Sequence, residues 1–194
     1  MSLPRRPQLP LSAIAVLVLA GLALPSVASS LTVPPVTHPV TGLKQIPKLA
    51  KAEYLKNVSE RKSDNVPRYH RGKGKVAPYS IGDAWCAAFS TWIWNKAGFD
   101  DYQGTDLLWE SHDGTEVAVQ VKDLTRWAQR NGYFSYRAKP GFLVAYGRSH
   151  IGIVLRADRD GRAVMSIEGN QSDQVSKVKI DMANVTGYIS PVRL

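Results

Sequence analysis

The residues of this chain that could perform nucleophilic chemistry are its one cysteine, Cys86, and its four histidines. A thiolate attacks carbonyl carbon atoms, and an imidazole beside it can exchange protons with the thiol and with a leaving group. Three histidines lie in proline-rich, basic or polar stretches: His38, His70 and His112. His150 instead opens an apolar, β-branched run at 150–155 that predicts a strand. Cys86 and His150 are therefore the candidate nucleophile and base.

Two polar residues follow the next predicted strand. Glu168 and Asn170 lie two residues apart at its end, so strand alternation would place both side chains on one face. An acid at this position can orient an imidazole and stabilise its charged form, as the third member of a serine triad does. Because Asp160-Gly161 favours a turn between the two strands, we expect a hairpin that makes His150 and Glu168 neighbours. Asn170 would share this role or bind substrate.

A predicted helix positions the cysteine. Asp83 is a typical N-cap residue, and Gly98 is a typical stop for a helix that runs through about residue 97. Cys86 would lie at about the third position, where free N–H groups and the positive end of the helix dipole favour a thiolate. The N–H of Cys86 could also stabilise an oxyanion. The alternative is an unreactive, buried cysteine that behaves as a small hydrophobic residue.

The remaining pattern predicts helices first and strands afterwards. Apolar residues three and four apart predict a helix over 46–58, and a further helix is expected over 122–130. Polar loops are expected over 60–80 and 100–115. Short β-branched or aromatic segments between turn residues predict five strands: 142–146, 150–157, 163–168, 175–180 and 185–192. This order predicts the α+β class with an antiparallel sheet.

The N-terminus predicts export from the cell. Arg5 and Arg6 precede an apolar run over 11–24 and small residues over 26–28, which is the layout of a cleavable signal peptide over 1–28. The run is shorter than the roughly 20 residues of a membrane span, although an uncleaved anchor is the alternative. An extended proline- and threonine-rich leader over 29–45 and one domain over 46–194 would follow. We expect a secreted or cell-wall-associated protein with no stable membrane span after cleavage.

The charge of the chain favours an anionic partner. The formal net charge is +9, and removal of the two signal-peptide arginines leaves +7. A basic exported protein suits a polyanionic surface such as a cell wall, whereas export argues against nucleic acid. The basic stretch over 61–75 could hold anionic wall polymers or be a solvated loop. No cysteine or histidine pair has metal-ligand spacing, so we expect no metal and no cofactor. We also expect a monomer.

The segments around the candidate residues resemble the CHAP family, the cysteine, histidine-dependent amidohydrolases/peptidases, in its secreted bacterial members. The similarity lies in WCAAFSTWIWNKAG at 85–98, PGFLV at 140–144 with SHIGIV at 149–154, and IEGN at 167–170. The order Cys, His, Glu/Asn matches too, with intervals of 64 and 18 residues. Phe142 stands where the family usually has aspartate, at a position outside the catalytic set.

The resemblance implies a papain-like fold, with the cysteine helix packed on a central antiparallel sheet. It also implies hydrolysis of peptidoglycan amide bonds, between glycan and peptide or within the peptide, by Cys86, His150, Glu168 and Asn170. Two alternatives remain open. One is a non-catalytic wall-binding domain of the same fold, and the other is a transpeptidase or toxin that uses the same triad.

Overall fold

A buried helix, α2 (Cys86–Lys96), lies at the centre of the fold. The computed structural model describes residues 40–72, 74–102, 107–147 and 149–194, and nine of the eleven residues of α2 are buried in it. Two aromatic side chains of this helix pack around Tyr79, whose ring centroid lies 5.2 Å from that of Phe89 and 5.4 Å from that of Trp92. Each such burial stabilises the fold by about 1.5–3 kcal/mol. The core therefore holds α2 rigidly.

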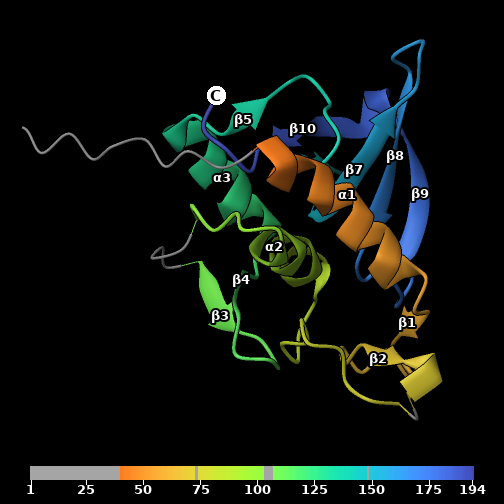
Figure 1. The fold of residues 1–194 in the computed structure, drawn as a ribbon. Coiled ribbons are helices and arrows are strands. Elements are labelled where there is room, and N and C mark those ends of the chain that lie inside the picture. The colour runs from red at the N-terminus through yellow and green to blue at the C-terminus, as the bar shows by residue number, and fades with distance from the viewer. Residues whose placement is uncertain (1–39, 73, 103–106, 148) are drawn as a thin grey trace, which may run out of the picture. The chain divides into compact units, whose positions relative to one another are not determined.

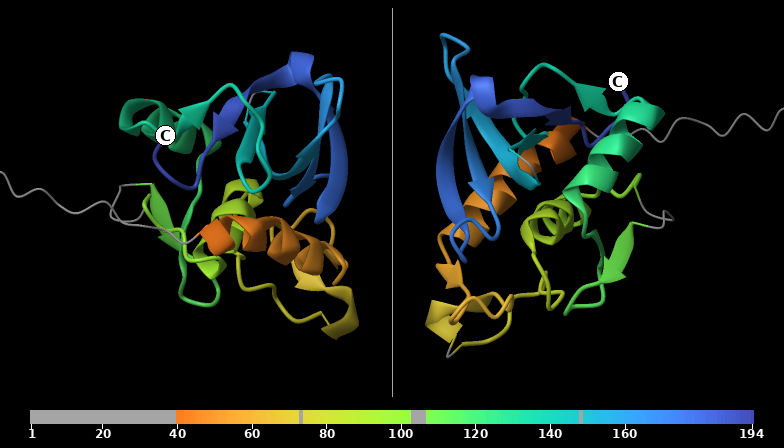
Figure 2. Two further views of the ribbon diagram at one scale, coloured as in Figure 1. Left: turned by 45° about the horizontal axis from the view of Figure 1, so that its top comes forward. Right: turned by 180° about the vertical axis from the view of Figure 1, so that it is seen from behind.

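A six-stranded antiparallel sheet packs on this helix, in the order β5-β10-β6-β7-β8-β9 (Figure 1). Its strands are β5 (Phe134–Ser135), β6 (Leu143–Tyr146), β7 (His150–Ala157), β8 (Ala163–Glu168), β9 (Ser176–Asp181) and β10 (Val185–Ile189). Both α1 (Val40–Tyr54) and α2 pack against β7 and β8, as the two views of Figure 2 also show. This arrangement confirms the α+β prediction. The five expected strands are all present, and the bounds of β7 and β8 coincide with the predicted ones.

The first helix begins earlier than predicted. α1 starts at Val40 and ends at Tyr54, so residues 40–45 are helical and the prediction of an extended leader was wrong there. Packing explains the difference, because Gly42 is buried so close to the Phe99 ring that an added methyl group would overlap it. This contact outweighs the turn-forming composition of the segment. The predicted signal peptide over 1–28 and the leader over 29–39 lie outside the described residues.

The two segments predicted as loops contain short elements. The first holds β2 (Arg68–Tyr69), paired with β1 (Val58–Ser59), and a 3-10 turn, η1 (His70–Gly72). In the second, β3 (Leu108–Glu110) pairs with β4 (Glu116–Ala118). Tertiary packing forms this hairpin, because the Ala118 N–H donates to Thr91 Oγ1 of α2 at 3.0 Å.

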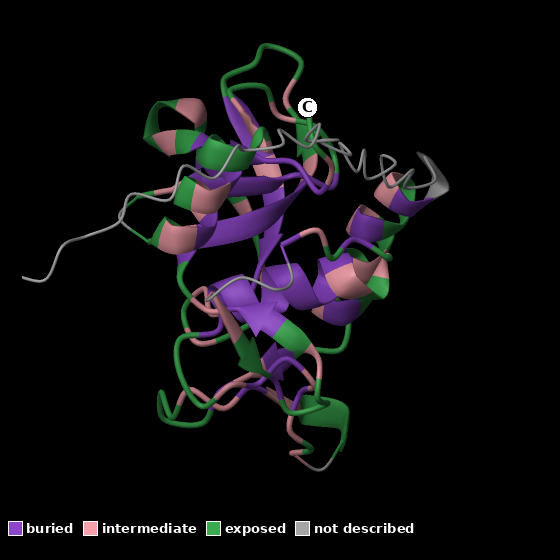
Figure 3. Ribbon diagram, turned by 90° about the vertical axis from the view of Figure 1, so that its left-hand side faces the viewer, coloured by how far each residue is buried: buried purple, intermediate pink, exposed green. Residues whose placement is uncertain are grey.

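The last elements agree with the sequence pattern. α3 (Val121–Asn131) ends at Gly132, whose φ of 81° is the left-handed conformation that glycine adopts readily. A second 3-10 turn, η2 (Met182–Asn184), precedes β10. Burial is concentrated in α2 and the sheet, while the connecting loops are mostly exposed (Figure 3). None of the described helices is long and apolar enough to cross a membrane.

Candidate active site

Cys86 is the first residue of α2. Trp85 occupies the N-cap position without a side-chain cap, and the carboxylate of Asp83 instead accepts the Ala84 N–H at 2.6 Å. The prediction of an Asp83 cap with Cys86 in the third position was therefore wrong, because a local turn uses the aspartate. The first helical hydrogen bond runs from the Phe89 N–H to the Trp85 carbonyl at 2.9 Å. The N–H of Cys86 thus lies at the positive end of the helix without an intrahelical acceptor.

A buried glutamate fixes the approach to the cysteine. Glu60 Oε1 accepts the indole N–H of Trp85 at 2.5 Å, and Glu60 Oε2 accepts the Asn65 N–H at 2.7 Å. Asn170 completes this network: its amide nitrogen donates to Glu60 Oε1 at 3.1 Å and its amide oxygen accepts the Trp85 N–H at 3.3 Å. Glu60 and Asn170 therefore orient the residue that precedes the candidate nucleophile.

Asn170 consequently differs from its predicted placement. Strand β8 ends at Glu168, and Asn170 has a φ of 57°, so the strand alternation that would align the two side chains stops before it. Between them, Gly169 lies so close to α2 that an added methyl group would overlap the side chains of Phe89 and Trp85. The 168–170 turn thus joins the end of β8 to the start of α2, with Glu168 on one side and Asn170 on the other.

His150 and Glu168 lie together, as the predicted hairpin requires. Glu168 Oε2 is 3.1 Å from His150 Nε2, an ion-pair distance when the ring is protonated, although the ring nitrogen is not aligned for a hydrogen bond. The glutamate side chain is fully buried, whereas the imidazole is 22% exposed. Gly152 makes this placement possible, because an added methyl group there would overlap the Glu168 side chain.

The imidazole also interacts with the cysteine. Burial lowers the pKa of His150, but its interactions with Cys86 and with the Glu168 carboxylate outweigh the effect of burial and raise this pKa to about 9. The thiol lies beside the start of β7, with Cys86 Sγ 3.9 Å from the carbonyl oxygen of Ser149. These interactions favour the imidazolium form of His150 at neutral pH, between the Cys86 sulfur and the Glu168 carboxylate.

Two hydroxyl groups that the sequence analysis did not single out complete the carboxylate's surroundings. Tyr146 donates to Glu168 Oε2 at 2.6 Å, and Ser166 donates to Glu168 Oε1. Tyr146 lies directly opposite His150 in the β6–β7 register, and the two rings are 5.4 Å apart. Burial and the neighbouring carboxylate raise the pKa of Tyr146 above its usual value, so its hydroxyl stays a donor at neutral pH. The alternation of Ser166 and Glu168 on β8 is the one sequence signal that could have identified Ser166.

The other two histidines that the structure describes, His70 and His112, lie outside this cluster. His70 Nε2 pairs with Ser59 Oγ at 2.7 Å on the β1–β2 hairpin, and His112 is exposed. His38 lies outside the described residues. Within the part of the chain that the structure describes, no group of three or more His, Cys, Asp or Glu side chains could hold a metal ion.

The cluster resembles in its geometry the nucleophile, base and orienting acid of an acyl-transfer enzyme. Three different elements supply these groups: the start of α2, the start of β7 and the end of β8. Comparisons of the chain with protein-family models, with curated proteins and with solved structures found no match to any of them, so the site stands on its own geometry.

Proposed function

We propose that this protein is a secreted cysteine hydrolase of the CHAP type, with a papain-like fold, that cleaves amide bonds in peptidoglycan. The observation that supports it most is the placement of His150 between the Cys86 thiol and the buried Glu168 carboxylate, which raises the pKa of His150 to about 9. An imidazolium beside a cysteine stabilises the thiolate, which is the attacking form. A buried, unreactive cysteine would not need these neighbours.

In the first proposed step, the Cys86 thiolate attacks the amide carbonyl carbon and forms a C–S bond. The carbonyl oxygen becomes an oxyanion, for which the Cys86 N–H at the start of α2 is a suitable donor. His150 then donates its proton to the amide nitrogen, the C–N bond breaks and an amine leaves. Because Nε2 faces Glu168, Nδ1 is the ring nitrogen that exchanges this proton.

In the second step, water hydrolyses the resulting thioester. Neutral His150 takes a proton from the water, the oxygen attacks the thioester carbon, and the C–S bond breaks. The products are a carboxylic acid and the restored thiolate–imidazolium pair. Throughout the cycle, Glu168 stabilises the charged form of His150 and fixes the orientation of its ring.

The choice of substrate rests on the CHAP resemblance, the expected export and the basic composition. A second candidate function is binding of anionic wall polymers without catalysis. It is favoured by a separate cavity of about 400 Å³ on the β1–β2 side, which three cationic residues line together with Tyr69 and without any carboxylate. These cationic residues are Lys56, Arg71 and Lys75.

The test is digestion of purified peptidoglycan, with released fragments identified by mass spectrometry. We expect the wild-type protein to release new amines and Cys86→Ala to lose at least about 10³-fold in rate, since the nucleophile is removed. Products that carry an added amine acceptor would indicate a transpeptidase. If neither protein releases fragments and both bind the wall equally, the hydrolase proposal is wrong and the binding function remains.

A further inference from the structure

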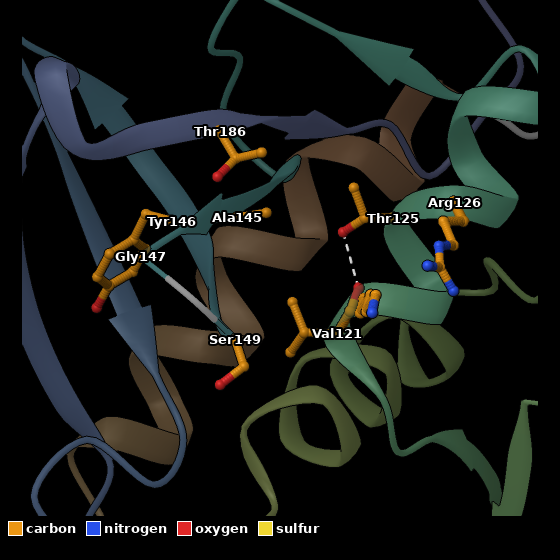
Figure 4. A pocket seen from close by; sticks show the side chains of 9 residues that line it. Val121, Thr125, Arg126, Ala145, Tyr146, Gly147, Ser149 and Thr186 are labelled. Carbon is orange, nitrogen blue, oxygen red and sulfur yellow. Dashed lines mark hydrogen bonds between the residues drawn. The ribbon is translucent and has the colours of Figure 1, made fainter.

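A cavity with a basic lining lies beside the catalytic cluster. Its volume is about 190 Å³, and its walls come from α3, the end of β6, the following turn and β10 (Figure 4). The lining residues are Val121, Lys122, Thr125, Arg126, Ala145, Tyr146, Gly147, Ser149 and Thr186. Two of them also belong to the candidate active site, because Tyr146 binds Glu168 and the Ser149 carbonyl lies 3.9 Å from Cys86 Sγ. A group held here would therefore lie next to the reacting bond.

The size of the cavity limits what it can hold. Sites for whole drug-sized ligands measure about 300–1,000 Å³, so this cavity suits one amino-acid residue of a longer substrate. Val121 and Ala145 provide apolar walls, and Thr186 and Ser149 provide hydroxyl groups. The occupant should therefore combine a short aliphatic part with a polar end.

The charges of the lining specify that polar end. Lys122 and Arg126 are cationic, and no residue of the lining is acidic. Arg126 is 3.4 Å from Asp123, and Figure 4 shows its guanidinium turned away from Tyr146 and Ser149. Lys122 has no acidic partner among the residues that the structure describes, so its charge is available to a ligand. The buried Glu168 nearby does not cancel this charge, because it faces the His150 imidazolium.

We propose that this cavity binds a carboxylate-bearing residue of the substrate peptide, adjacent to the scissile amide, with Lys122 as its main charged contact. This inference rests on the proposed hydrolase function and names the class of peptide that it would select. Lys122 is held by α3, whose first turn is fixed by packing of the buried Val121 and Leu124. A lysine on a rigid helix can select for a negative charge at a defined distance from Cys86.

The test compares synthetic peptide substrates that differ only in one group next to the scissile amide, a free carboxylate or a carboxamide. One pair carries this group on the acyl side and a second pair carries it on the amine side, which shows the side that the cavity serves. We expect the wild-type protein to prefer the carboxylate in one pair. Lys122→Gln should raise KM for that substrate up to about fivefold, the range of an exposed ion pair, and leave kcat and the carboxamide substrate unchanged.

Two matched variants serve as controls. Lys122→Arg should keep the wild-type preference, and Lys48→Gln, which removes another exposed lysine, on α1, should change nothing. A wild-type protein with no preference in either pair would overturn the proposal. So would an equal effect of Lys122→Gln on both members of the pair that the wild type discriminates, or no effect on either of them.

Binding to the inactive Cys86→Ala protein separates this proposal from the hydrolase proposal. Calorimetric titration with the same peptides should show Lys122-dependent preference for the carboxylate even without turnover. If the wild-type protein hydrolyses no peptide but this preference is present, the cavity proposal holds and the hydrolase proposal fails. Equal affinity for the carboxylate and the carboxamide peptide in both pairs overturns the cavity proposal, whatever the activity.

Discussion

Two buried glutamates in this protein each accept a hydrogen bond from a tyrosine, yet their surroundings differ. Glu168 accepts the hydroxyl of Tyr146, and Glu53 on α1 accepts the hydroxyl of Tyr69, both at 2.6 Å. The exposed fractions of the two glutamates are 0% and 2%. In both cases the second carboxylate oxygen also has a partner, so neither charge is left unsatisfied.

The difference lies in the cationic group that each carboxylate faces. Glu53 pairs with the nearby Lys56 at 2.5 Å, and the hydrogen bond that it accepts from Tyr69 joins the end of α1 to β2. Glu168 faces His150, which also interacts with Cys86, and it binds Tyr146, which lines an accessible cavity. A buried Tyr–Glu pair can therefore serve only to stabilise the fold. It becomes part of a candidate active site when the same carboxylate also contacts a group that exchanges protons.

Neutralising each glutamate should have the largest effects, on kcat for Glu168 and on the free energy of unfolding for Glu53. Glu168→Gln removes the charge that stabilises the His150 imidazolium, so we expect kcat to fall by about 10²-fold in a variant that still folds. Glu53→Gln removes the partner of Lys56, so we expect a lower free energy of unfolding, by about 1–3 kcal/mol, with kcat unchanged. Kinetics on released peptides and urea unfolding measure the two effects.

The comparison would fail if the two variants behaved alike. A large kcat loss in Glu53→Gln, measured where the variant is fully folded, would mean that the β1–β2 side takes part in catalysis. Equal unfolding curves and equal rates for wild type and Glu168→Gln would remove Glu168 from the site.

The pH dependence of activity should also distinguish Glu168 from Glu53. With a pKa of about 9, His150 loses its proton as the pH rises through 9, so activity should decline there because the leaving amine is no longer protonated. Glu168→Gln removes an interaction that raises this pKa, so the decline should move to lower pH. Glu53→Gln should leave the decline in place.

Stability gives an independent readout of the same proton. The pKa of His150 is raised from 6.5 to about 9, so the protonated ring adds stability that is fully present below about pH 6.5 and is lost as the pH rises through 9. Urea unfolding of the wild type across this window should show the decline, and Glu168→Gln should show a smaller one. A wild-type stability that is flat over this window would contradict the assignment.

Patterns of local sequence predicted the strands of this fold better than the site details. The runs at 150–157 and 163–168 have β-branched or apolar residues and end at turn residues, so β7 and β8 agree with the prediction and bring His150 and Glu168 together. The start of α2 was predicted less well. Asp83 has the residue type of an N-cap, but its carboxylate binds the next N–H, and no local pattern distinguishes these uses.

Contacts between distant segments could not be predicted from the pattern. The positive φ of Asn170 and its contact with Glu60 depend on how the 168–170 turn meets α2. Tyr146 has the sequence context of an ordinary strand residue, and its hydrogen bond to Glu168 spans the sheet between β6 and β8. Such residues are found only when the strand order is known.

Removing one hydroxyl from each tyrosine is the finest test of the comparison. Tyr146→Phe takes a donor from the same Glu168 oxygen that faces His150, so more of the carboxylate's negative charge acts on the imidazolium. We expect kcat to fall by about three- to tenfold, as for loss of a hydrogen bond to a charged group. The alkaline decline in activity should move to higher pH, opposite to the direction expected for Glu168→Gln.

Tyr69→Phe is the matched control, because it removes an equally short hydrogen bond to a buried carboxylate whose ion-pair partner is Lys56. It should lower the free energy of unfolding by about 1–3 kcal/mol and leave the pH profile unchanged. If Tyr146→Phe also leaves the alkaline decline where the wild type has it, Tyr146 stabilises the fold as Tyr69 does. If the decline moves, Tyr146 tunes the charge that Glu168 presents to His150. The two glutamates then differ because only Glu168 acts on a group that exchanges protons.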